Sequence, residues 1–217
     1  MMGHFITFEG PEGGGKSTHI RRLAERLRAS GQDVVVTREP GGTPLGEAIR
    51  GLLQHDAAGE SPVPRAETLL FCASRAQLVQ AVIRPALARG AWVLADRFAD
   101  STFAYQGAGR GFLLADLQAA NAFATGGLVP DLTLLLDLDA DEARRRLAGR
   151  GAPAGGADRF EREPPDFHAR LRAGFLALAA AEPGRFAVIP AGRPVDDVAD
   201  DVWRTVADRL PVPPGSV

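Results

Sequence analysis

The sequence predicts an α/β fold in which a mainly parallel, five-stranded sheet carries helices on both faces. Three observations predict it. Short apolar segments alternate with amphipathic helical segments along the whole chain. Several of these apolar segments are runs of β-branched or leucine residues, which is typical of strands buried on both sides in a parallel sheet. The length of 217 residues is enough for one domain with a full core, so we expect residues 1–217 to form a single domain.

The first half of the chain follows this alternation closely. HFITFE (4–9) is short and alternating and predicts a strand. Apolar residues then recur at i, i+3, i+4 and i+7 from Ile20, which predicts a helix that stops near Gly31. DVVVT (33–37) predicts a second, buried strand. The segments that follow are a turn-rich loop, a helix, an exposed loop and one long helix, at 38–43, 44–53, 54–63 and 64–89.

The second half repeats the pattern. Apolar runs predict three more strands, WVLA, LTLLLDL and FAVIP, at 92–95, 132–138 and 186–190. Helical spacing predicts five helices, at 100–106, 113–125, 141–149, 164–181 and 195–210. The segment 149–158 is rich in Gly and Ala and is expected to be mobile, and the tail 211–217 is expected to fray.

Composition excludes several classes of function. The net charge is −2, so a general basic field for gripping a nucleic acid polymer is absent. Cys72 is the only cysteine, which rules out an internal disulfide and fits a reducing compartment. The sequence has neither an apolar run of transmembrane length nor a basic leader followed by an apolar stretch. We therefore expect a cytoplasmic protein without a membrane partner.

The only lysine of the chain lies in a glycine-rich turn. Arg accounts for 24 of the 25 basic residues, and Lys16 is the exception. It belongs to GPEGGGKS (10–17), in which Gly10, Gly15, Lys16 and Ser17 complete the P-loop pattern between a strand and a helix. Glycines let the backbone amides face phosphate oxygens, the lysine ammonium reaches the β- and γ-phosphates, and the serine hydroxyl can face Mg²⁺. The sequence thus predicts binding of a nucleoside triphosphate with Mg²⁺.

A carboxylate is expected on the metal side of this loop, and two residues could supply it. Asp96 and Asp137 each follow a predicted buried strand. We prefer Asp96, because Arg97 follows it and would meet an anionic ligand at the carboxyl end of a parallel strand. Asp137 could instead support the start of the next helix.

Among proteins that use nucleoside triphosphates, a small kinase fits best. A guanine-reading Asn-Lys-x-Asp element is impossible in a chain without a second lysine, and a motor usually needs more domains. A kinase needs an acceptor pocket, and Phe71 and Arg75 lie four apart on one helix, where they could stack on and bond a planar base. The alternative is a buried ring beside a surface cation. Arg97, at a strand end, suits an acceptor phosphate.

A kinase also needs a lid that excludes water. Arginines precede and follow the Gly-rich segment 149–158, at Arg144, Arg145, Arg146, Arg150 and Arg159. Such cations fit a lid, at about 146–160, that closes over the migrating phosphoryl group. The alternative is a solvated helix face followed by a loose loop.

These motifs together resemble the thymidylate kinase family. The resemblance covers nearly the whole chain and rests on FEGPEGGGKST, TREPGGT, LLFCASRAQ, DRFADSTFAYQGAGRG and DRFE, at 8–18, 37–43, 69–77, 96–111 and 158–161. It implies a P-loop NTPase-type fold with a mobile lid, ATP and Mg²⁺ as cofactors, and dTMP as the acceptor. It also implies a homodimer.

The resemblance implies roles for residues of the acceptor region, at about 38–107. Phe71 would stack on thymine, and Arg75 would bond its O4. Arg97 would hold the dTMP phosphate, with Arg38 and Glu39 nearby. The sugar and base would be lined by four further residues, Ser101, Thr102, Tyr105 and Gln106, with Tyr105 favouring deoxyribose.

It also implies roles around the ATP phosphates. Glu12, inside the P-loop, would reach the 3′-hydroxyl of dTMP, and Asp96 would join the metal and phosphate network. The loop residues that would bind ATP include Gly13, Gly14 and Thr18, and Arg193 would lie on the adenine side. Family members without a P-loop arginine carry the catalytic arginine in the lid. Arg150 is the first candidate here, with Arg146 and Arg159 next.

The expected reaction is direct in-line transfer of the ATP γ-phosphoryl group to dTMP, giving dTDP and ADP for dTTP synthesis. An acceptor phosphate oxygen is already anionic and needs no general base. Two alternatives stay open. The first is another small kinase, which acts either on a deoxynucleoside, with a base such as Glu39 or Asp100, or on a different monophosphate. The second is a nucleotide-dependent switch, which would bind ATP without an acceptor.

Overall fold

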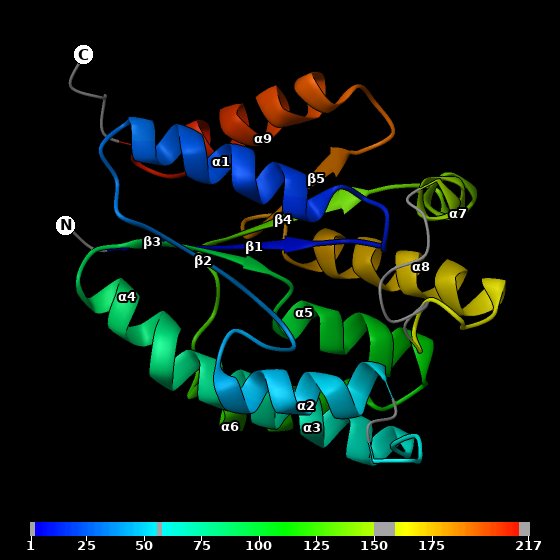
Figure 1. Ribbon diagram of the computed structural model, residues 1–217. Coiled ribbons are helices and arrows are strands. Elements are labelled where there is room, and N and C mark those ends of the chain that lie inside the picture. The colour runs from blue at the N-terminus through cyan, green and yellow to red at the C-terminus, as the bar shows by residue number, and fades with distance from the viewer. Residues whose placement is uncertain (1–2, 56–57, 150–158, 213–217) are drawn as a thin grey trace.

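The computed structural model describes residues 3–55, 58–149 and 159–212. Its centre is one parallel sheet in the strand order β2-β3-β1-β4-β5 (Figure 1). The strands are β1 (Phe5–Glu9), β2 (Val34–Arg38), β3 (Trp92–Asp96), β4 (Leu132–Asp137) and β5 (Phe186–Pro190). All five predicted strands are therefore confirmed, and their registers place every carboxyl end at the same edge of the sheet. Such an edge is where ligands bind in open parallel sheets.

Helices cover both faces, as predicted. On one face lie α1 (Lys16–Ala29) and α9 (Val195–Arg209), and on the other lie α4 (Arg84–Ala88), α5 (Ala99–Thr102) and α8 (Pro165–Ala181) (Figure 1). Below them α2 (Pro44–Gln54), α3 (Pro64–Leu78) and α6 (Leu114–Thr125) pack together, and α7 (Ala140–Ala148) lies beyond the carboxyl edge. The apolar stripe that begins at Ile20 is buried against Val198 and Val202 of α9, which confirms the predicted face of α1.

The predicted helix 64–89 is not uniform. A π-helical stretch, η1 (Val79–Ile83), separates α3 from α4. Pro85 follows it, and a proline ring lacks an N–H and crowds the carbonyl four residues earlier, so the winding widens there. A second π-helical stretch, η2 (Phe103–Gly109), continues α5 and extends the helix expected at 100–106. This widening brings residues of η2 against α8.

Two further predictions concern membrane-spanning segments and the mobile segment 149–158. None of the helices in the described segments is long and apolar enough to cross a membrane. Most of the predicted mobile segment, 150–158, lies outside the residues that the structure describes.

Candidate active site

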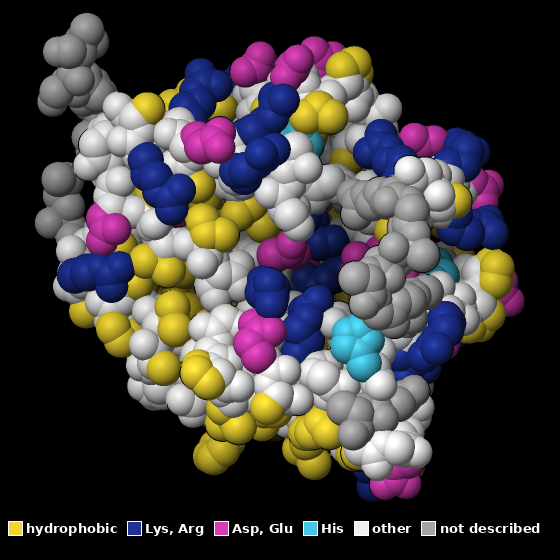
Figure 2. All heavy atoms as spheres, viewed as in Figure 1, with side chains coloured by type: hydrophobic (Ala, Val, Ile, Leu, Met, Phe, Trp, Pro, Cys, Tyr) yellow, Lys and Arg dark blue, Asp and Glu magenta, His cyan; other side chains and the backbone are white. Residues whose placement is uncertain are grey.

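A cavity of about 660 Å³ opens at the carboxyl edge of the strands. Figure 2 shows its mouth as a hollow in which basic and acidic side chains face each other. The lining comes from the P-loop with the start of α1, the loop after β2, α2, α3, the turn after β3, α5, η2 and the segment 160–161. Segments far apart in the sequence thus meet in one space, as the parallel topology requires.

Two backbone carbonyl groups of the P-loop hold Lys16 in place. The Lys16 ammonium donates to the carbonyl oxygens of Gly10 (3.1 Å) and Pro11 (2.9 Å), and the residue is buried. Burial, followed by the charge of Arg97, lowers the pKa of Lys16. Gly10 has φ 125°, and a Cβ atom there would lie 2.4 Å from the Leu136 carbonyl oxygen, so this position requires glycine.

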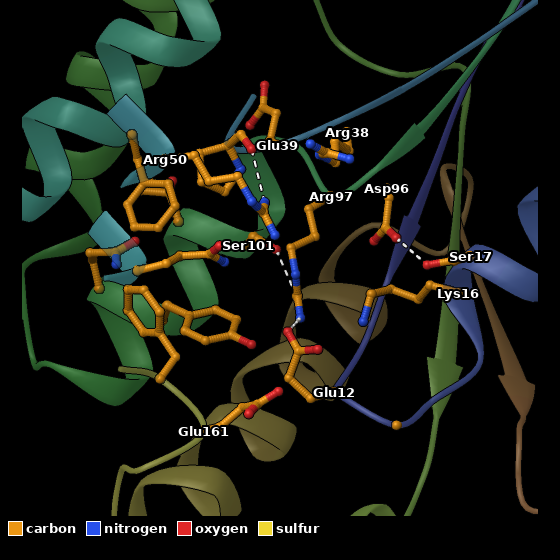
Figure 3. Close-up of a pocket in the computed structure, with 18 of the residues that line it drawn as sticks. Glu12, Lys16, Ser17, Arg38, Glu39, Arg50, Asp96, Arg97, Ser101 and Glu161 are labelled. Atoms are coloured by element: carbon orange, nitrogen blue, oxygen red, sulfur yellow. Dashed lines mark hydrogen bonds and ion pairs between the residues drawn. The ribbon is translucent and has the colours of Figure 1, made fainter. Parts of the chain in front are cut away.

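The metal side of the loop distinguishes the two candidate acids. Ser17 Oγ donates to Asp96 Oδ2 at 3.0 Å (Figure 3). Asp137 is instead held by Arg172, at 2.7 and 2.8 Å. In the described part of the chain no three His, Cys, Asp or Glu residues cluster as a metal site. One carboxylate and one hydroxyl fit Mg²⁺, which usually takes its other ligands from waters and substrate phosphates.

Arg97 lies between the P-loop and the rest of the cavity. Its guanidinium pairs with Glu12 (2.6 Å) and donates to the Gly10 carbonyl and the Ser101 hydroxyl (both 3.2 Å) (Figure 3). Its backbone is left-handed, with φ 73°, the only such value among the non-glycine residues described. Burial of Glu12 acts to raise its pKa, but Arg97 and Lys16 hold that pKa down to about 2. Cation and acid are thus already paired at this point.

Glu9, at the end of β1, is a buried acid that the sequence analysis did not single out. Its carboxylate accepts from the amides of Phe98 (2.8 Å) and Ser101 (3.3 Å) and from the Ser101 hydroxyl (2.6 Å). Burial and the nearby charge of Asp100 raise its pKa to about 7. These bonds fix the turn that carries Arg97. Its place in the sequence could have indicated it, because a glutamate at the end of a buried strand, directly before the P-loop, is an unusual acid.

The far end of the cavity is aromatic. Phe71 of α3 and Tyr105 of η2 both contact Phe160, with ring centroids 5.8 and 5.6 Å apart. Thr102 and Gln106 also line this end. The structure places Phe71, Thr102, Tyr105 and Gln106 on the lining of one cavity together with Phe160, and their roles toward a substrate stay predictions.

Arg75 does not line this cavity. It is 1% exposed, and its five N–H groups face Glu39, Thr102, Asn121 and the Phe98 carbonyl. A direct bond from Arg75 to a base would require one of these partners to be exchanged. Its predicted role in base reading stays a prediction, and the structure places its guanidinium behind Thr102.

The loop after β2 contributes the predicted Arg38 and Glu39. Both line the cavity, with Arg38 paired to Glu47 at 2.8 Å and Glu39 paired to Arg75. Arg50 also lines it and donates to the Pro40 carbonyl at 3.0 Å. The sequence analysis missed Arg50, because it lies in the middle of α2 outside every motif.

The lid candidates have different surroundings. Arg146 pairs with Glu142 on α7 at 3.0 Å, and Arg159 pairs with Glu67 at 2.6 Å. Neither lines the cavity, whereas Glu161 does. Arg150 lies outside the described residues. Arg193 pairs with Asp201 at 2.5 Å and is also absent from the cavity lining.

The family model described as thymidylate kinase matches residues 8–202 of this chain. This chain belongs to the thymidylate kinase family. It is 54% identical to the thymidylate kinase of Deinococcus radiodurans, across 96% of this chain and 98% of the relative. Identity is 53% to those of Solidesulfovibrio magneticus (95% of this chain, 100% of the relative) and Caulobacter vibrioides (96% and 98%). The family resemblance stated on sequence motifs is thereby confirmed over nearly the full length.

Proposed function

We propose that this protein transfers the γ-phosphoryl group of ATP to dTMP, giving dTDP and ADP in dTTP synthesis. Family membership over nearly the whole chain supports this activity. The observation that carries it for this chain is the cavity itself. It joins a P-loop to a pocket lined by Phe71, Tyr105 and Phe160, with Arg97 between the two.

Donor binding uses the P-loop. The amides of the loop (residues 10–15) and the Lys16 ammonium hold the ATP phosphates. Thr18, which lines the same cavity, joins them. Ser17 and Asp96 would hold Mg²⁺. When bound, the ion would supply positive charge against the phosphates, while the chain's own cations fix the direction of the phosphate oxygens.

Acceptor binding uses the other end. Arg97 holds the dTMP phosphate, Phe71 stacks on the base, and Tyr105 packs against the sugar. When a phosphate takes the place of the Glu12 carboxylate on Arg97, that carboxylate becomes available to the sugar 3′-hydroxyl. The attacking phosphate oxygen is anionic, so no side chain removes a proton from it. Holding both groups in line supplies most of the catalysis.

The transition-state charge needs a further cation. Arg150 is the first candidate for this role, with Arg146 and Arg159 next. Arg159 is anchored to Glu67 and to the Leu53 carbonyl, and Arg146 to Glu142. These partners favour Arg146 over Arg159 as the second choice, because Arg146 and Glu142 are each about one-third exposed, whereas the acid that holds Arg159 is only 1% exposed.

The protein acts as a homodimer in this proposal. The described helices α3 and α6, which pack on each other, carry large exposed apolar residues. Phe123 is 93% exposed, and Leu69 and Leu114 are also exposed. A phenylalanine this exposed on a helix is typical of an interface between copies.

A panel of acceptors tests the activity. Release of ADP is measured with dTMP, dUMP, dCMP, UMP and thymidine in the presence of ATP and Mg²⁺. We expect dTMP to give the highest kcat/KM. Faster turnover of thymidine would assign a nucleoside kinase, and ATP binding without any phosphorylated acceptor would assign a nucleotide-dependent switch.

A further inference from the structure

Glu67 of α3 is buried directly behind the aromatic end of the cavity. It is 0% exposed and accepts hydrogen bonds from three side chains. Gln106 Nε2 donates at 2.8 Å, Arg159 at 2.6 Å and Arg110 at 3.2 Å. A carboxylate flanked by two guanidinium groups presents only acceptors to its remaining neighbour.

The amide of Gln106 therefore has one orientation. Its NH₂ group must face Glu67, because the amide oxygen would meet another acceptor there. The Oε1 atom is thus turned away from Glu67, and the residue lines the cavity. Within the described segments no donor reaches Gln106 Oε1. Gln106 Oε1 is consequently an acceptor without a donor on the cavity lining, and its position is fixed by the bond from Gln106 to Glu67.

A second contact joins α3 to the same helical segment. In this contact α3 supplies the donor, Arg75, instead of the acceptor. Arg75 donates to Thr102 Oγ1 at 3.0 Å, so the Thr102 hydroxyl hydrogen must point elsewhere. Glu67, Phe71 and Arg75 lie four residues apart on α3, as do Thr102 and Gln106 on the facing segment. A hydroxyl donor and an amide acceptor thus lie one helical turn apart, on the lining of the cavity that Phe71 also lines.

We propose that Glu67 is a positioning residue for pyrimidine selection, which rests on the proposed function. By fixing the amide of Gln106, it presents an acceptor to the ring N–H of thymine or uracil, while Thr102 donates to the adjacent carbonyl. A 4-aminopyrimidine such as cytosine reverses both groups. Its amine meets the Thr102 hydrogen, and its ring nitrogen meets the Gln106 oxygen. Such a mismatch leaves buried polar groups unpaired and is strongly disfavoured.

The test compares kcat/KM and Kd for dTMP and dCMP in the full-length protein and in Glu67→Gln. An amide at position 67 can accept or donate, so Gln106 is free to turn. We expect the ratio of dTMP to dCMP to fall about tenfold, mainly through KM for dTMP, with kcat little changed. Arg110→Met is the matched control, because it removes one guanidinium from Glu67 but keeps the Glu67–Gln106 bond. Its ratio should stay within about twofold of the unmodified protein.

A double-mutant cycle separates orientation from a general change of shape. In Gln106→Leu there is no amide to orient, so adding Glu67→Gln should leave the ratio unchanged. If Glu67→Gln does not fold in a thermal melt, Glu67→Asp answers the same question, because it keeps the charge for both arginines but withdraws from Gln106. An unchanged ratio in a folded position-67 variant, or the same fall in the Gln106→Leu background, would overturn the proposal. Failure of the unmodified protein to phosphorylate dTMP would instead refute the proposed function.

Discussion

The left-handed backbone of Arg97 allows its conformation and its charge to be tested separately. At φ 73° a side chain that begins with Cβ is strained by about 1–2 kcal/mol, whereas glycine is not. Arg97→Ala and Arg97→Gly both remove the guanidinium and its bond to Glu12, so this loss cancels between them. The glycine variant should therefore be the more stable of the two by about 1 kcal/mol, after allowing for its greater unfolded-state entropy.

Urea and thermal unfolding of the two variants measure this difference. In a chain of this length about 1 kcal/mol corresponds to a Tm difference of about 2–4 °C. Both variants should lose kcat/KM for dTMP by about 100-fold or more, because the phosphate loses its charge-assisted partner. An alanine variant as stable as the glycine variant would refute the backbone argument. Near-normal turnover in either would refute the role of Arg97 in holding phosphate, whatever the stabilities.

Three other predictions concern separate parts of the molecule. Lys16→Ala should lower turnover by about 10²–10³-fold with an unchanged melting profile, and near-normal turnover would contradict its role at the phosphates. For Glu9, the folded pKa of about 7 exceeds the reference 4.5, so the folded protein holds the proton more tightly and stability falls as pH rises from about 4.5 to 7. The fall is at most about 3 kcal/mol in urea titrations, and a carboxyl signal that titrates near 4.5 by NMR would exclude it. Phe123→Glu should yield monomers in light scattering, and an unchanged mass would place the interface elsewhere, or show that the unmodified protein is itself monomeric.

The fold was predictable because its signals are local. DVVVT and LTLLLDL predicted buried strands, and the structure forms them as β2 and β4. β4 is buried, but β2 lies at the edge of the sheet with Val36 46% exposed, so the prediction of burial on both sides is wrong for β2. The break at Val79–Ile83 was missed, although Pro85 stands in the sequence as its cause. Helical periodicity hides such a change of winding, because one wider turn shifts the apolar stripe only slightly.

The site was predictable only in part. The P-loop follows from contiguous residues, but the two carbonyl oxygens that hold Lys16 were not predicted. The flanking Arg97 favoured Asp96 over Asp137, but both acids end a strand, and the local sequence could not show what holds Asp137. Arg172, far along the chain, pairs with Asp137 and leaves Asp96 to Ser17. Long-range partners of this kind leave no periodic signal in one sequence.

The cations of the site are positioned by partners within the protein itself, and this is the main physical basis for the proposed transfer. Lys16 is held by two carbonyl oxygens and Arg97 by the Glu12 carboxylate, so neither needs to search for its place. Phosphate oxygens that enter the cavity would replace partners of these two cations that are already negative or strongly polar. The exchange keeps each cation paired throughout, which limits the desolvation cost that an unpaired buried charge would carry. Glu9 contributes to this positioning as well, because its three hydrogen bonds stabilise the turn that carries Arg97.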